Sequence, residues 1–143
     1  MDKRIINLAN WLSKHYYEYV PDILIEKASE KYGIKRAYLI LILIALRELH
    51  QSFPDKPASW YQRAIIRLLM GVERTGKKSW RVKGIKELGD MYEIYNVWLS
   101  KDGKYQCDCY YRQWGHKRRK HICTHIAAVI LSRKINKPIT IYT

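Results

Sequence analysis

The stretch CDCYYRQWGHKRRKHICTH, residues 107–125, decides the fold of the C-terminal half of this chain. It holds all three cysteines of the 143-residue sequence, three of the five histidines and the densest run of positive charge. Cys107 and Cys109 form a C-x-C pattern, and after thirteen intervening residues Cys123 and His125 form a C-x-H pattern. Three thiolates and one imidazole are a common closed ligand set of structural zinc sites, and sulfur ligands favour zinc over magnesium or calcium. The stretch therefore predicts one structural Zn²⁺.

The spacing of these four residues also predicts local structure. Alternate residues of a strand point to one face, so Cys107 and Cys109 can share a face of a strand. Positions two apart in a helix interior point nearly opposite ways, so Cys123 must lie at or before a helix start. We therefore expect a helix that begins near Cys123 or Thr124, with His125 in its first turn. The positive end of the helix dipole then lies near the thiolates.

Other readings of the cysteines and histidines remain open. His116 and His121 could replace His125 as a ligand, but the C-x-H spacing favours His125. The cysteines could also be buried and unconnected, or one could be a nucleophile with His121 or His125 as its base. A nucleophile needs one thiol and a separately oriented base, whereas here three thiols stand at ligand spacing.

Charge points to a polyanionic partner. The formal net charge is +14, and residues 76–143 carry 15 Lys and Arg against 5 Asp and Glu. Nucleic acid is the first expectation and an anionic membrane surface the second. The basic run would offset the net negative charge of a three-thiolate zinc site and could contact phosphates, while a nearby tryptophan could stack on unpaired bases. The residues predicted to bind nucleic acid are Arg112, Trp114, Lys117, Arg118, Arg119 and Lys120.

The two halves of the chain differ in their patterns. Residues 1–75 predict a helical region, with helices near residues 4–19, 22–33, 35–50 and 59–72. The third helix is apolar on every side in its middle, so we expect it to be the central buried element. Residues 76–143 predict a zinc-binding region, with strands near 79–86, 91–99 and 104–111 and a closing helix. The fold class is therefore α+β, with a helical half followed by a small zinc-stapled antiparallel sheet.

The sequence also predicts the cellular location of the protein. The N-terminus lacks a secretory signal, and the longest apolar run, Ala37–Leu46, is too short to span a bilayer as a helix. Three cysteines cannot all pair within one chain, which argues against a disulfide framework. We expect a cytoplasmic protein with no membrane partner.

With its flanks, the metal pattern resembles the SWIM zinc-finger family, whose signature is C-x-C, a variable gap and C-x-H on a short sheet followed by a helix. YNVWLSKDGKYQCDC, residues 95–109, is similar to the strand and hairpin that precede the first ligands. ICTHIAAVIL, residues 122–131, is similar to the closing helix, including the small residues after the histidine. The resemblance covers roughly Trp80 to Arg133.

The resemblance implies a DNA-binding or protein-binding module. Family members occur in transposases, helicase-like ATPases and ubiquitin ligases, and some small members are partners of RecA-family recombinase paralogues. A short archaeal or archaeal-virus protein would fit the last pattern. This chain carries no phosphate-loop motif, and four protein ligands leave zinc no open position. We therefore expect a non-enzymatic accessory protein that binds nucleic acid, with DNA favoured, in recombination or repair.

The alternative function is protein interaction through the helical half. The partner would be a RecA-family ATPase or another copy of this chain. An exposed apolar patch that includes Trp11, Tyr16 or Tyr17 would favour it.

Overall fold

A computed structural model describes residues 1–110 and 122–136 of the chain. The described ranges contain five α-helices and one four-stranded antiparallel sheet, which confirms the α+β class. The helices are α1 (Lys3–His15), α2 (Asp22–Tyr32), α3 (Arg36–Ser52), α4 (Ala58–Met70) and α6 (Thr124–Ile135). The strands are β1 (Val72–Gly76), β2 (Ser79–Lys83), β3 (Ile94–Leu99) and β4 (Tyr105–Cys107), with short 3-10 helices η1 (Lys86–Leu88) and η2 (Asp108–Tyr110).

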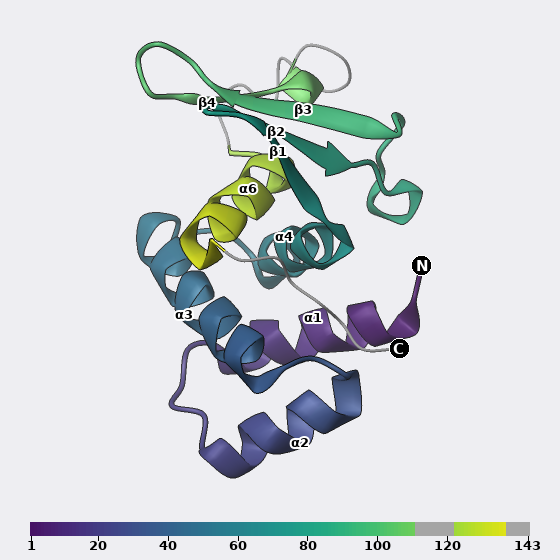
Figure 1. The fold of residues 1–143 in the computed structure, drawn as a ribbon, viewed down its shortest axis with the longest axis vertical. Helices are drawn as coiled ribbons and strands as arrows, with labels where there is room; N and C mark the ends of the chain where they lie inside the picture. The colour runs from purple at the N-terminus through teal and green to yellow at the C-terminus, as the bar shows by residue number, and fades with distance from the viewer. Residues whose placement is uncertain (111–121, 137–143) are drawn as a thin grey trace.

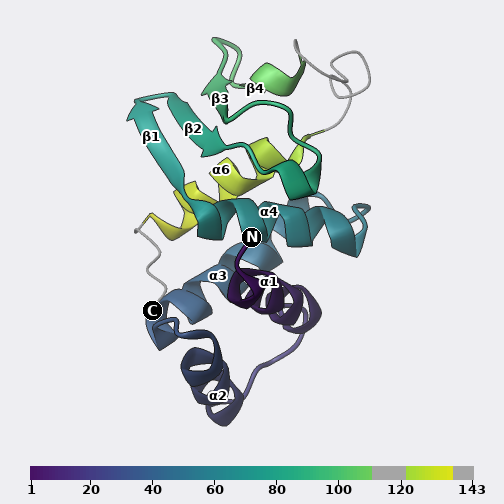
Figure 2. The ribbon, with the colours of Figure 1, turned by 90° about the vertical axis from the view of Figure 1, so that its right-hand side faces the viewer.

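The elements are stacked in layers (Figures 1 and 2). The sheet forms one end of the molecule and α6 lies across its inner face. Helices α3 and α4 pack on the other side of α6, and α1 and α2 form the far end. The helical half and the sheet are thus joined mainly through α6, with further contacts between α4 and strands β1 and β2.

Helix α6 is the central buried element, and the expectation that α3 would take this place is wrong. Ala127, Leu131 and Ile135 on α6 belong to the core of the helical half, whereas Ile126 and Val129 belong to the core beneath the sheet. A helix that is apolar on all sides needs such double burial. Helix α3 instead buries one side and leaves Ile40 and Ile44 exposed.

A short turn joins α2 to α3. Gly33 ends α2 with a φ of 66°, a left-handed conformation that suits glycine. The side of α3 that holds Leu39, Ile42 and Leu46 is buried in the helical core. None of the helices in residues 1–110 and 122–136 combines the length and apolar composition that a membrane span requires.

Strand β1 was not expected. The sequence predicted a helix through Val72, with the following residues as its end, but α4 stops at Met70 and Gly71 turns the chain with a φ of 118°. Strand β1 forms a hairpin with β2, in the sheet order β1-β2-β3-β4. It lies at the sheet edge and only Val72 is partly buried, so the alternation typical of a half-buried strand is missing. The strand also crosses the expected boundary between residues 75 and 76.

Gly84 allows the chain to pass close to its neighbour after β2. Its amide donates to the Glu93 carbonyl over 2.7 Å, and a Cβ at this position would lie 1.7 Å from the Tyr92 carbonyl oxygen. We expect Gly84→Ala to push β2 and β3 apart and to lower the free energy of unfolding by about 1–3 kcal/mol. Urea denaturation of the purified variant measures the loss.

The matched control is Gly76→Ala. There the added Cβ meets only the Ser79 hydroxyl, the end of a side chain that can rotate. Equal stability of the two variants would contradict the close approach at Gly84.

Candidate metal centre

The structure brings Cys107, Cys109, Cys123 and His125 together. All four side chains are buried, and the ligand atoms lie within 4.8 Å of one another. Cys107 ends β4, Cys109 lies in η2, and the other two residues stand at the start of α6. Segments far apart in the chain thus converge on a cluster that is consistent with one metal site.

Helix α6 begins where the ligand spacing predicted. Cys123 is its N-cap, and the Cys123 sulfur accepts a hydrogen bond from the Ile126 amide over 3.5 Å. His125 follows in the first turn, so both side chains can face the same point. The positive end of the helix dipole stabilises negative charge on this sulfur.

The second cysteine does not lie in a strand as expected. Strand β4 ends at Cys107, and Cys109 belongs to η2. The Cα atoms of alternate residues in a straight strand lie about 6.6 Å apart, whereas the ligand atoms of the cluster all lie within 4.8 Å of one another. The 3-10 turn closes this distance, and Asp108 holds it by accepting from the backbone and side-chain nitrogens of Asn96 over 2.9 and 2.8 Å.

The imidazole of His125 presents one nitrogen to the cluster. Its Nε2 is 3.2 Å from Oδ1 of Asp90, so this nitrogen carries the hydrogen and donates. Its Nδ1 is buried and has no hydrogen-bond partner among the described residues. Buried polar atoms seldom lack a partner, so an unpaired Nδ1 beside three thiols fits a metal ligand. The Tyr95 ring stacks on the imidazole with centroids 4.1 Å apart and fixes its plane.

Asp90 connects the metal site to the helical half. Its carboxylate accepts from both terminal nitrogens of Arg67 over 2.5 and 3.1 Å, and from the Ile85 amide over 2.8 Å. Arg67 comes from α4 and is 2% exposed, and its Nε donates to the Thr124 hydroxyl over 2.9 Å. A carboxylate that orients a ligating histidine is a frequent partner of protein metal sites. Here that carboxylate is itself held by a buried arginine.

The sequence analysis missed Arg67 and Asp90. A single arginine inside the apolar run AIIRLLM, residues 64–70, is the one signal for the first. Charged residues are almost never fully buried unless they are paired, so such a position predicts a buried partner. Asp90 follows a glycine in a turn and offers no comparable signal.

The pKa values of the cluster residues follow from the contacts among Arg67, Asp90 and His125. Burial raises the pKa of Asp90, but hydrogen bonds from His125 and Arg67 outweigh it and hold that pKa well below its usual range. Burial lowers the pKa of His125, while its contacts with Asp90, Cys109 and Cys123 raise it to about 10. Hydrogen bonds from Cys107 and Cys123 lower the pKa of the Cys109 thiol. A metal ion at this site therefore replaces protons on sulfur and on Nδ1.

The nucleic-acid-binding residues expected from the sequence lie outside the described residues. These are Arg112, Trp114, Lys117, Arg118, Arg119 and Lys120, together with the alternative ligands His116 and His121. The structure places the residues on either side of them. Cys109 and Cys123 are both in the metal cluster, so the intervening segment begins and ends there.

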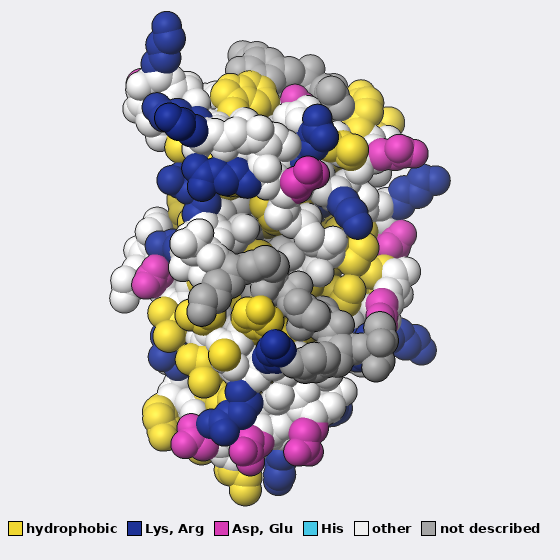
Figure 3. Space-filling model, in the orientation of Figure 1, with side chains coloured by type: hydrophobic (Ala, Val, Ile, Leu, Met, Phe, Trp, Pro, Cys, Tyr) yellow, Lys and Arg dark blue, Asp and Glu magenta, His cyan; other side chains and the backbone are white. Residues whose placement is uncertain are grey.

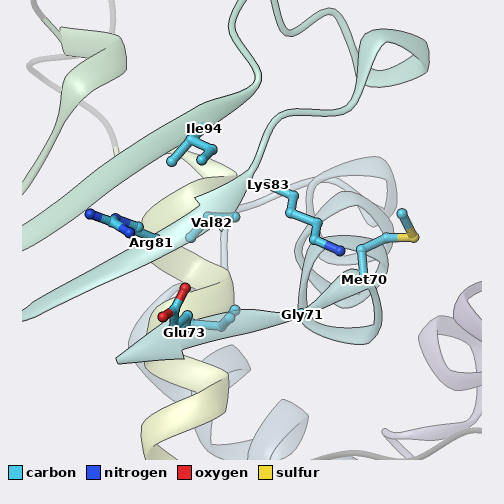
Figure 4. Close-up of a pocket in the computed structure, with 8 residues that line it drawn as sticks. Met70, Gly71, Glu73, Arg81, Val82, Lys83 and Ile94 are labelled. Carbon is cyan, nitrogen blue, oxygen red and sulfur yellow. The ribbon is translucent and has the colours of Figure 1, made fainter. Parts of the chain in front are cut away.

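A hollow of about 250 Å³ lies on the sheet, away from the metal cluster (Figure 4). Arg81 and Lys83 extend from β2 at its sides, and Glu73 extends from β1. Apolar side chains at the end of α4 and on the strands complete its lining: Met70, Val72, Val82 and Ile94. No metal-cluster residue lines it, so it is a separate surface feature.

Comparisons of the chain with protein-family models, with curated proteins and with solved structures gave no match. The resemblance to the SWIM family therefore rests on the residues quoted for it.

Removing one ligand should abolish metal binding. We expect Cys107→Ser to lower the metal content from one ion per chain to none, because the remaining groups no longer close the coordination shell. Elemental analysis of the purified protein measures this. The control is His50→Gln, which removes an imidazole that contacts Tyr16 in the helical half and should leave the metal content unchanged. Full metal content in the cysteine variant would contradict the site.

Neutralising Asp90 should weaken both the metal site and the fold. Asp90→Asn removes the charge that orients His125, so metal affinity should fall by about 10- to 100-fold in the folded protein. It also leaves Arg67 buried without a counter-ion, which costs about 3–5 kcal/mol of stability. Competition with a chromophoric chelator and urea denaturation measure the two effects.

Asp22→Asn is the matched control, because the Asp22 side chain is 89% exposed. It should change neither quantity. An Asp90→Asn variant with unchanged metal affinity would show that the carboxylate does not orient His125.

Proposed function

We propose that this chain is a zinc-stabilised accessory protein that binds nucleic acid, with DNA as the favoured target, and that it acts in recombination or repair. The ligand set supports zinc as the metal, because thiolate and imidazole ligands in a tetrahedral set suit Zn²⁺. Four protein ligands also leave such an ion no open position for water or substrate. The metal then has a structural role, and the protein is not an enzyme.

The anchoring of residues 110–122 at the metal cluster carries the proposal. This segment contains five Lys and Arg and no Asp or Glu. It begins directly after Cys109 and ends directly before Cys123, and both residues are buried in the cluster. Fixing the two ends lowers the entropy that the segment loses on binding. A cation-rich segment held in this way can contact several phosphates.

Phosphate contacts would set the character of the binding. They position a protein on nucleic acid but carry no sequence information. They also make affinity depend steeply on salt, because each contact releases condensed counter-ions. The proposed binding is therefore weakly sequence-specific and salt-dependent.

A second candidate function is protein interaction through the helical half. Exposed apolar side chains gather around the start of α2, namely Tyr17, Tyr19, Ile23 and Leu24. Of the aromatics expected in such a patch, Tyr16 is buried, Trp11 is partly buried and Tyr17 is 57% exposed. This surface suits a protein partner, either a RecA-family ATPase or another copy of the chain. It lies at the other end of the molecule from the sheet, so both functions can coexist.

Fluorescence anisotropy with single- and double-stranded oligonucleotides over a salt series tests the nucleic-acid proposal. The basic-segment variant changes Lys117, Arg118, Arg119 and Lys120 to Gln, and it is used after its metal content and fold have been checked. Each lost phosphate contact should make the slope of log affinity against log salt shallower by about 0.7 to 0.9.

A control variant with Lys3, Lys14, Lys27 and Lys31 changed to Gln removes the same charge from exposed positions on α1 and α2. It should bind nearly as the unchanged protein does. Unchanged protein that does not bind, or that binds with no salt dependence, would overturn the proposed function.

A further inference from the structure

We propose that the end of the sheet formed by its two hairpin turns is a second phosphate-binding surface for nucleic acid, separate from residues 110–122. We name it the sheet-end ridge. The proposal rests on the function proposed above and adds a surface that lies on described residues. The ridge consists of six exposed cations: Arg74, Lys77, Lys78, Lys101, Lys104 and Arg133.

The sheet topology brings these cations together. In the antiparallel order β1-β2-β3-β4, the β1–β2 turn and the β3–β4 turn lie at the same end. The Leu99 amide donates to the Lys78 carbonyl over 2.9 Å and joins the two turns directly. Lys and Arg side chains gather over this end of the molecule, around the β3–β4 hairpin at the upper left of Figure 3. Four lysines from two different turns thus lie on one surface.

Nearby acidic residues leave most of the positive charge of the ridge unneutralised. None of its six cations forms an ion pair with a residue in the described part of the chain, whereas Arg4 and Arg36 in the helical half pair with nearby carboxylates. The two turns contain one acidic residue, Asp102. Its carboxylate accepts from the Ser100 hydroxyl and the Lys104 amide, and it offsets one of the six positive charges. The ridge therefore presents an excess of positive charge to an anionic partner.

Two of the cations are held in place by neutral groups. The guanidinium groups of Arg74 and Arg133 lie 5.7 and 5.1 Å from the centroid of the buried Trp80 ring. Arg74 donates to the Gly76 and Lys77 carbonyls over 2.9 and 2.7 Å. Arg133 donates to the Tyr105 hydroxyl over 2.7 Å and lines a hollow of about 280 Å³. Because these partners are neutral, both arginines are ordered before binding and keep their full charge, which lowers the entropy cost of a phosphate contact.

The surroundings favour nucleic acid over a membrane. A membrane-binding surface combines cations with exposed apolar side chains that enter the bilayer. The large apolar residues exposed on the described sheet half, Met91, Tyr92 and Ile94, lie before β3 or at its start, away from the two turns. Lys104 is three residues from Cys107, about 10 Å along the strand. The ridge therefore lies near the metal cluster.

The test is a ridge variant with Lys77, Lys78, Lys101 and Lys104 changed to Gln, compared with the α1 and α2 control variant that carries the same change in charge. Both are measured as full chains with metal bound, by anisotropy over a salt series. We expect the ridge variant to lose about 10-fold or more in affinity for the oligonucleotides and its salt slope to become shallower by about 0.7 to 0.9 for each lost contact. The control should stay within about twofold of the unchanged protein.

The other outcomes separate this inference from the proposed function. If the unchanged protein binds and the ridge variant matches the control, the ridge is not a contact surface, although the proposed function stands. If the unchanged protein binds neither single- nor double-stranded oligonucleotides, the proposed function fails and the ridge inference fails with it. A ridge variant that loses as much affinity for polyglutamate or for phosphatidylserine vesicles as it loses for the oligonucleotides is the last outcome. That result would show a general anion-binding surface and overturn the assignment to nucleic acid.

Discussion

The carboxylate of Asp90 is the constraint on which the rest of this structure depends. It is buried between a guanidinium from α4 and an imidazole from α6, and it also receives the Ile85 amide. A buried carboxylate is tolerated only when charged partners and hydrogen bonds replace the water it has lost. The three groups therefore have to be buried together. In this way the position of a metal ligand is tied to the packing of a helix from the other half of the chain.

The apolar residues of helix α6 also connect the metal site to the helical half. Its residues alternate between the core beneath the sheet and the core of the helical half. Cys123 is its N-cap and His125 lies in its first turn, so two of the four residues that would bind the metal lie on the same short stretch, residues 123–135, as the apolar residues that enter both cores. The metal cluster fixes where this helix starts, and the two cores fix which way its sides face.

The spacing of residues along the sequence was sufficient to predict much of the candidate site. The C-x-C and C-x-H patterns predicted the four clustered residues and the start of α6, because ligand geometry restricts where two residues can converge. The mixed helical and strand patterns predicted the α+β class. What the sequence did not reveal depends on distant partners. Arg67 and Asp90 pair across 23 residues. A lone arginine in an apolar run indicates that a buried partner exists, but it does not identify which residue that partner is.

The errors in local structure have equally physical causes. Strand β1 is an exposed edge that lacks the alternation by which strands are recognised. Strand β4 ends at Cys107 because the chain turns there into η2, which brings Cys109 into the cluster. The apolar middle of α3 suggested burial on all sides, yet Ile40 and Ile44 stay exposed because no described element covers that face. The sheet-end ridge could not be seen in the sequence, since its lysines come from turns that only the strand order brings together.

The arginine contributed by α4 has a consequence for how the sheet and α6 could have been inherited. A self-contained zinc finger can be moved between proteins as a cassette, because all of its supporting contacts lie within it. Here the histidine is oriented through a carboxylate whose counter-ion belongs to a helix outside the sheet and α6. A host that received only the sheet and α6 would inherit a buried acid without its cation. The metal-cluster region and the helical half are therefore expected to be inherited together, as one unit.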